Sequence, residues 1–256
     1  MSKSNTNRER RDMVEQMRKQ ARASERRRTT IVIAACVAVA LVIVSVAGYS
    51  IIQDRQETAA LKQKQLTDIG AAAADAGCGS IQEEKATGES QHTTDAVDYA
   101  VVPPAFGAHN PTADDSGSHF YTTSDRPEIE ILVHNLEHGW TIAWYDETIA
   151  DDADQMRLLK ATAEKFDAEG DNPEFNMIIA PWTEDDGGGR PIPDGKHIAF
   201  THWSIHQPVY KPPTSDEPPP AFGQSLYCDT FSGAALDDFM KKYPYDDAPE
   251  GYLWHP

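Results

Sequence analysis

Cysteine, positive charge and the common nucleotide or nucleophile motifs are all scarce in this 256-residue sequence. The triple glycine at 187–189 lies in an acidic stretch rather than between a strand and a helix, so it predicts a turn and no phosphate-binding loop. No G-x-S-x-G segment is present, and neither Cys78 nor Cys228 has the sequence context of a nucleophile. These absences argue against nucleotide binding and against hydrolysis by a serine or cysteine nucleophile.

Charged residues are absent from residues 31–52. At about 1.5 Å per residue this run crosses a hydrocarbon core of roughly 30 Å, so it predicts a transmembrane helix. A cleaved signal peptide is the alternative, but its apolar region spans only about 7–15 residues, and a small-residue cleavage site is weak here. We therefore expect one membrane anchor, in contact with the lipid bilayer through this run.

Positive charge is concentrated before the apolar run. Residues 1–28 carry ten Lys/Arg against four Asp/Glu, a net charge of +6. Because Lys and Arg remain on the cytoplasmic side, the N-terminus should be cytoplasmic and residues 53–256 outside the plasma membrane. The whole chain carries −18, so the outer part carries −24. This excess disfavours nucleic acid as a partner; it either keeps the domain soluble or suits cations or a basic partner.

Two cysteines are expected outside the membrane. Cys36 lies inside the apolar run, whereas Cys78 and Cys228 follow it, in a compartment where disulfides persist. With no other outer cysteine to compete, these two should form one bridge. Closing so long a loop would contribute about 4–5 kcal/mol in the chain-entropy model. A two-cysteine copper site is less favoured, because it needs both thiolates close together.

Four runs of β-branched and aromatic residues predict a roughly four-stranded sheet, antiparallel or mixed. These runs are 128–134, 140–145, 175–182 and 197–205. A further short strand is expected within 98–111, where it runs into a Pro/Gly turn. The glycine-rich stretch 183–195 and the proline-rich stretch 207–223 predict surface loops.

Amphipathic stretches at 149–169 and 233–244 predict two helices packed on this sheet. Residues 53–76, rich in Ala, Gln and Lys, predict a juxtamembrane helix, and 80–97 is loop-like. The expected fold class is α+β, with a single N-terminal transmembrane helix before the sheet and its helices. The expected parts are a basic cytoplasmic tail (1–28), the transmembrane helix (29–52), a juxtamembrane helix with linker (53–97) and an extracytoplasmic α+β domain (98–256).

The segment ILVHNLEHGWTIAWY, residues 131–145, contains His134, Glu137 and His138 in an H-x-x-E-H pattern. In one class of zinc metalloproteases this pattern places two metal ligands and a catalytic glutamate on a helix. Gly139 and the β-rich sequence on both sides favour a strand connection instead. A protease is therefore the least favoured interpretation.

A metal site without proteolysis is the stronger hypothesis. His134 and His138 share a face in a helix and point to one side in an extended segment, so they converge in either conformation. Imidazole suits Zn or Cu, and His109 is the first candidate for a third ligand. Met177 would suit Cu(I) if it faced the same way. The alternative is that the histidines brace backbone groups in a tight connection.

Three segments in this order, VVPPAFGAHNP, LVHNLEHGWTIAWY and MIIAPW, resemble the domain-of-unknown-function family 3105, found mainly in actinobacteria and their relatives. The resemblance covers roughly residues 98–243. Ala105 and Phe106 depart from the usual Thr-Ser, and His119 matches no position of the family pattern. The residues that match the motif are His109, His134, Glu137, His138 and Gly139.

The resemblance implies a membrane-anchored or exported domain of unknown activity. Some anchored actinobacterial relatives look like accessory subunits of the cytochrome bc–aa3 respiratory supercomplex, and this chain is similar in layout. The leading expectation is therefore a non-catalytic accessory or assembly subunit, with respiratory oxidase subunits as partners. The alternatives are a metal-binding protein that delivers copper or zinc to an oxidase, and a metal-dependent hydrolase.

Overall fold

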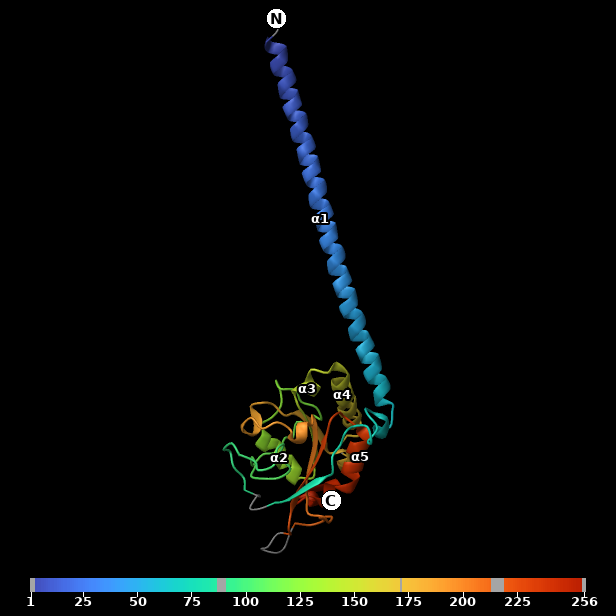
Figure 1. Ribbon diagram of the computed structural model, residues 1–256, viewed down its shortest axis with the longest axis vertical. Helices are drawn as coiled ribbons and strands as arrows, with labels where there is room; N and C mark the ends of the chain where they lie inside the picture. Colours follow the sequence, from blue (N-terminus) through green and yellow to red (C-terminus); the bar gives the residue numbers. More distant parts are fainter. Residues whose placement is uncertain (1–2, 87–90, 171, 213–218, 255–256) are drawn as a thin grey trace. The chain divides into compact units, whose positions relative to one another are not determined.

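The computed structural model describes residues 3–86, 91–170, 172–212 and 219–254 (Figure 1). The chain divides into two compact units, Met1–Gln56 and Glu57–Pro256. The first is helical throughout its described residues, and the second contains the sheet, the remaining helices, Cys78 and Cys228.

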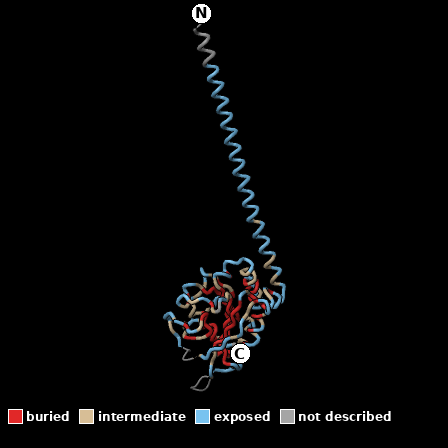
Figure 2. Tube along the Cα trace, viewed as in Figure 1, coloured by how far each residue is buried: buried red, intermediate tan, exposed pale blue. Residues whose placement is uncertain are grey.

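Helix α1 spans Lys3–Lys62 and contains the predicted apolar run. Its most apolar window has a mean hydropathy of 2.9 and is entirely unburied (Figure 2). Leu41 and Val44, for example, are 62% and 67% exposed. A helix that is apolar on all sides suits a membrane or a protein core, so α1 is long and apolar enough to span a bilayer. The helix predicted over 53–76 ends at Lys62, and turns follow it.

A five-stranded sheet forms the centre of the second unit, in the order β1-β5-β4-β2-β3. β2 and β3 run parallel, and every other neighbouring pair is antiparallel. The strands predicted at 140–145, 175–182 and 197–205 are confirmed as β2, β3 and β4. The strands are β1 (Gln82–Lys85), β2 (Thr141–Tyr145), β3 (Met177–Pro181), β4 (Ile198–Ser204) and β5 (Phe222–Cys228).

The strand prediction was wrong for four elements. Residues 128–134 belong to a helix. The described residues 98–111 form no strand beyond one bridge between His109 and His92. β1 and β5 were missed, because β1 is a polar QEEK edge strand and β5 begins inside the stretch read as a proline-rich loop. Both pair through backbone groups over long sequence distances, which a local pattern does not record.

Helices α4 (Ala153–Asp167) and α5 (Gly233–Lys242) cover one face of the sheet, as Figure 1 shows, and confirm both predicted helices. A short helix, α3 (Glu147–Ala150), precedes α4. The Asp152 and Ser232 side chains accept hydrogen bonds from backbone N–H groups of the first turns of α4 and α5. The core on this face includes Tyr145, Phe166, Met177, Phe200 and Phe239.

Helix α2 (Ile129–Glu137) lies against the opposite face. Side chains alternate along a strand, so Ala143 and Tyr145 contact the α4/α5 side while Ile142 and Trp144 contact the α2 side. This second core also contains Leu132 and Leu136 of α2 together with Trp203 of β4.

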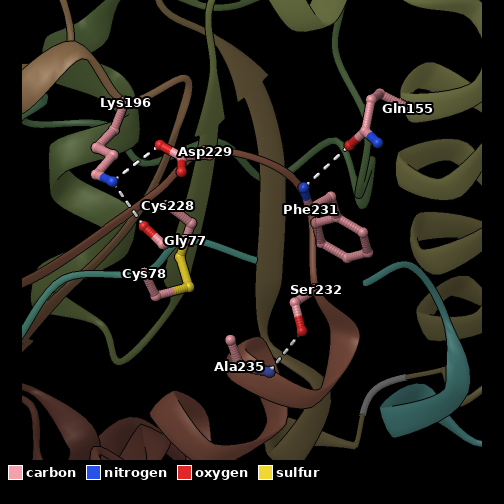
Figure 3. Close-up of a disulfide and its surroundings, with 9 residues drawn as sticks. All are labelled: Gly77, Cys78, Gln155, Lys196, Cys228, Asp229, Phe231, Ser232 and Ala235. Carbon is pink, nitrogen blue, oxygen red and sulfur yellow. Dashed lines mark hydrogen bonds and ion pairs between the residues drawn. A yellow bond between two sulfur atoms is a disulfide. The ribbon is translucent and has the colours of Figure 1, made fainter. Parts of the chain in front are cut away.

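The Cys78–Cys228 disulfide is present, as predicted (Figure 3). It joins the segment after α1 to the last residue of β5 across a sequence separation of 150 residues. The Lys196 ammonium donates to the Gly77 carbonyl and to the Asp229 carboxylate, so a second contact holds the same two segments together.

Candidate metal centre

Helix α2 forms because its apolar residues follow the helical spacing i, i+3, i+4, i+7, at Ile129, Leu132, Val133 and Leu136. The last three are completely buried against the sheet. The β-branched composition of the segment concealed this period in the strand prediction. Gly139 follows the helix at φ +85°, the left-handed conformation typical of a residue just after a helix end.

Gly139 also allows two backbone segments to approach each other. A Cβ atom at this position would lie 2.0 Å from the Tyr245 carbonyl oxygen, so only glycine fits. The C-terminal segment therefore passes directly beside the end of α2.

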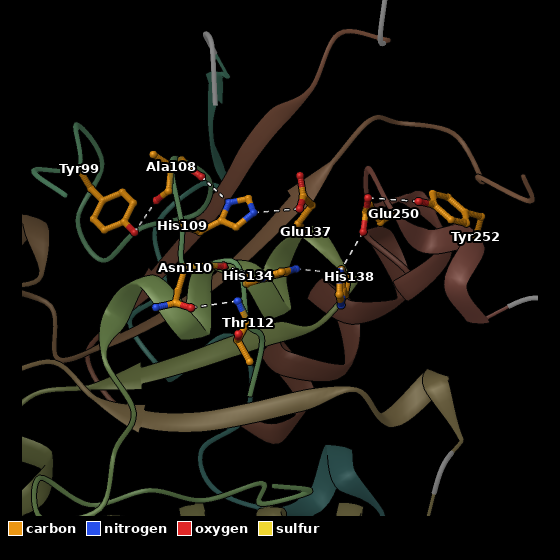
Figure 4. A network of polar contacts seen from close by, with 11 residues as sticks. Tyr99, Ala108, His109, Asn110, Thr112, His134, Glu137, His138, Glu250 and Tyr252 are labelled. Atoms are coloured by element: carbon orange, nitrogen blue, oxygen red, sulfur yellow. Dashed lines mark hydrogen bonds and ion pairs between the residues drawn. The ribbon is translucent and has the colours of Figure 1, made fainter. Parts of the chain in front are cut away.

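The helix places the three residues of the H-x-x-E-H pattern together at its C-terminal end. His134 and His138 are one turn apart, and their Nε2 atoms are 3.0 Å from each other (Figure 4). Glu137 is 5% exposed and lies beside them. The expectation of a strand connection is therefore wrong, and the missing helix no longer argues against a metalloprotease-like arrangement.

His109 reaches this group from the turn-rich segment before α2 and is fully buried. Its Nδ1 donates to the Gly107 carbonyl at 2.8 Å. Its Nε2 lies 3.0 Å from Glu137 Oε2, but the contact is not directed as a hydrogen bond, and this buried nitrogen has no hydrogen-bond partner among the described residues. Such an atom is costly to bury unless a proton or a cation occupies the space before it.

His134 is oriented in the same way. Its Nδ1 donates to the Asn110 carbonyl at 2.6 Å. A carbonyl only accepts, so in the neutral rings of His109 and His134 the proton is on Nδ1 and the lone pair is on Nε2. Metal-binding histidines are held by this kind of contact to backbone carbonyls. The Nε2 lone pairs of His109 and His134 are thus both available to one cation.

His92 completes what we call the inner cluster: His92, His109, His134 and Glu137, each with one ligand atom within 4.8 Å of the others. The His92 ring stacks on that of His134, with centroids 5.3 Å apart. Backbone hydrogen bonds from Thr93 to His109 and from His109 to Gln91 hold this exposed residue beside the helix. His92 was not predicted, because only this long-range pairing brings it to the site.

A second group, which we call the outer cluster, contains Glu137, His138 and Glu250, again within 4.8 Å of one another. His138 Nε2 is 3.0 Å from Glu250 Oε2. Figure 4 shows this contact continuing to the Tyr252 hydroxyl, which donates to Glu250 at 3.2 Å. Glu250 was not predicted as a site residue either, because it follows α2 by more than a hundred residues.

The electrostatics favour positive charge at the centre. Burial lowers the pKa of His109, but the Glu137 carboxylate and the Gly107 carbonyl outweigh it and leave that pKa raised. Burial lowers the pKa of His134, and the neighbouring His138 and His109 lower it further. The contact with His138 lowers the pKa of Glu250. His109 and His134 thus resist joint protonation, while the lowered pKa of Glu250 favours its anionic form.

The predicted ligands are only partly brought together. His109 and His134 meet in the inner cluster, and His138 belongs to the outer one. Met177 lies elsewhere, because it begins β3 with its side chain in the core beneath α4 and α5, whereas Ile178 faces α2. Neighbouring residues of a strand point to opposite faces of the sheet, so Met177 and Ile178 lie on different sides.

Other histidines form isolated contacts with carboxylates and brace the fold. His119 donates from Nδ1 to the Met177 carbonyl at 2.6 Å, and its Nε2 is 3.9 Å from Asp167. His255 lies outside the described residues. The remaining pairs are His197–Asp146, His202–Asp247 and His206–Glu83.

A family model described as "Protein of unknown function (DUF3105)" matches residues 90–253. The chain belongs to this family. The DUF3105 match contains every residue of both clusters, from His92 to Glu250. No curated protein and no solved structure matches the chain.

Proposed function

We propose that this chain is a membrane-anchored protein whose outer domain binds a zinc or copper ion through the inner cluster. The observation that carries the proposal is the buried Nε2 of His109. Within the described part of the chain it has no hydrogen-bond partner, yet it lies 3.0 Å from a buried carboxylate oxygen. A cation between the two would satisfy both atoms, and the orientation of His134 adds a second imidazole lone pair.

The donor set narrows the choice of metal. Three imidazoles and one carboxylate suit zinc, which takes four nitrogen, sulfur or oxygen ligands in a tetrahedral arrangement, and they also suit copper(II). Calcium and magnesium prefer oxygen ligands. The cluster includes the C-terminal end of α2, where the helix dipole favours cations. The −24 net charge of residues 53–256 acts in the same direction.

Metal-dependent hydrolysis ranks below simple binding. The helix required by the H-x-x-E-H arrangement is present. A catalytic zinc, however, keeps one coordination position open for water, and its glutamate stands free to act as a base. Here Glu137 is itself one of four ligands around the inner position, beside His109. Four protein ligands support storage, transfer or structural use of the ion.

The test is a metal titration of the full chain in mild detergent with Zn(II), Cu(II) and Cu(I), each against a competing chelator. We expect one tight inner ion, and a loss of at least tenfold in affinity for His109→Ala and for His134→Ala. His197→Ala is the matched control, since His197 also contacts a carboxylate, Asp146, but belongs to neither cluster. Equal affinities for all four proteins would refute the proposal.

We also propose that α1 anchors the domain with the N-terminus in the cytoplasm. The support is the exposed apolar window of α1 and the +6 charge of residues 1–28 before it. Protease added to intact spheroplasts should digest the chain beyond residue 57 and leave the basic tail. Protection of the outer domain would reverse the orientation.

An accessory role in a membrane complex is a second proposal, and it is compatible with the first. The supporting observations are the apolar surface of α1 and the resemblance to anchored respiratory subunits. A subunit of this kind could hold copper or zinc for an oxidase. Purification in gentle detergent should recover respiratory oxidase subunits with the chain. Their absence, with other chains present, would identify a different complex.

A further inference from the structure

Glu137 is the one residue that belongs to both candidate clusters, and it has two carboxylate oxygens. Its Oε2 lies 3.0 Å from the His109 Nε2 in the inner cluster. The outer cluster adds His138 and Glu250, and the two clusters approach again where the His134 and His138 Nε2 atoms are 3.0 Å apart. A carboxylate shared between two ligand sets is a recurrent feature of two-metal centres, whose ions are about 3.5–4 Å apart.

The outer ligands are held in place by contacts of their own. The Glu250 backbone N–H donates to the Glu137 carbonyl at 3.0 Å, which attaches the C-terminal segment to the end of α2. Three residues earlier, Asp247 accepts from the fully buried Ser204 at 2.7 Å and contacts the His202 Nε2 at 3.1 Å. The segment carrying Glu250 is therefore fastened to β4 on one side and to α2 on the other.

The two clusters differ in access to solvent. In the inner cluster the His109 and Glu137 side chains are 0% and 6% exposed, and His92 is its one exposed ligand, whereas in the outer cluster both His138 and Glu250 are partly exposed, at 24% and 35%. An ion in the outer cluster would have only three protein ligands and would complete its coordination with water. Such an open position allows ligand exchange, in contrast to a closed four-ligand site.

We infer that the centre binds two cations, the inner one held by four protein ligands and the outer one by three and exchangeable, with Glu137 bridging them. This inference rests on the proposed function for the inner ion and adds His138 and Glu250 as ligands of the second. Both ions are of the zinc or copper class, because imidazole contributes to each. The outer position is the one through which a metal would enter or leave.

The experiment measures metal stoichiometry on the full chain in mild detergent. The chain is loaded with Zn(II), desalted, and analysed for metal per protein, and a titration then separates tight from weak sites. The wild type should bind two ions of unequal affinity. Glu250→Gln and, independently, His138→Gln should retain one tight ion. The exposed Glu184→Gln removes the same charge outside both clusters and should still bind two.

The bridge has its own signature. Two Cu(II) ions sharing a carboxylate couple magnetically, so the doubly loaded protein should show less electron paramagnetic resonance intensity than its copper content requires. Full intensity from a doubly loaded protein would exclude the bridge. One ion that is lost in His109→Ala and unchanged in Glu250→Gln would overturn the second site while leaving the proposed function intact. No bound ion in the folded wild type would overturn both.

Discussion

The two faces of the central sheet have different covers. On one face, α4 and α5 are regular amphipathic helices with capped N-termini, and the core beneath them is apolar. On the other, the nine-residue α2 shares the cover with turn-rich chain that includes His109. The α4/α5 face packs through apolar side chains, whereas the α2 face also gathers the buried histidine and glutamate side chains for which we propose a cation.

The largest expected effect is loss of the disulfide, which borders the α4/α5 core. Replacing both Cys78 and Cys228 by alanine should lower the free energy of unfolding by about 5 kcal/mol, because the bond closes a loop of 150 residues. Every tryptophan follows Gly139, so fluorescence during denaturant unfolding reports on this domain alone. Any variant that folds should keep wild-type metal affinity; a weakened affinity would mean that the two faces are not independent.

Next comes the core beneath α5. Phe239→Ala should lower the free energy of unfolding by about 3–5 kcal/mol, because the side chain is 1% exposed and its removal leaves a cavity. Asp238→Ala, at the exposed neighbouring position, should stay within about 0.5 kcal/mol of the wild type. Similar losses for both would show that this core does not carry the stability assigned to it.

The α2 face should show a conditional effect. Zn(II) at a hundred times its dissociation constant should raise the free energy of unfolding by about 2.7 kcal/mol, because the ion binds the folded chain. The gain should shrink below pH 6.5, about the pKa of free imidazole, where protons compete for the ligands. It should vanish in His134→Ala and persist in Phe239→Ala. A gain that persists in His134→Ala would place the metal elsewhere.

The smallest effect concerns an ion pair away from both clusters. Arg126 donates to both carboxylate oxygens of the buried Asp186, at 2.6 and 2.9 Å. Burial raises the pKa of Asp186, but the hydrogen bonds from Arg126 and Thr183 outweigh this and leave it lowered. A lowered pKa in the folded state means that the pair stabilises the protein at neutral pH, and that this contribution is lost as pH falls below about 4.

Asp186→Asn tests this pair. The substitution should lower the free energy of unfolding by about 1.5 kcal/mol at pH 7 without changing metal binding. It should also remove the loss of stability at low pH that comes from protonation of Asp186. The measurement is the free energy of unfolding at pH 7 and at several pH values below about 4. An equal pH dependence in both proteins would exclude a role for Asp186.

The α4/α5 face was the more predictable one from sequence. The apolar residues of α4, α5 and strands β2 to β4 recur at regular helical or strand spacing, and these residues are the ones that the structure buries. α2 was misassigned because its isoleucines, leucines and valine satisfy both a β-rich composition and a helical spacing. The family motif did point to His109, His134 and His138. His92 and Glu250 came only from long-range backbone contacts, and Met177 was misplaced by strand parity.

The glycine after α2 makes the centre sensitive to a single backbone position. The chain segments that carry His138 and Glu250 approach each other main chain to main chain at Gly139 and Tyr245, in addition to their side-chain contacts. One added carbon at Gly139 would therefore push these segments apart. Gly139→Ala adds one carbon atom, which would move the segment that carries Glu250 away from the end of α2 while every candidate ligand stays in the sequence.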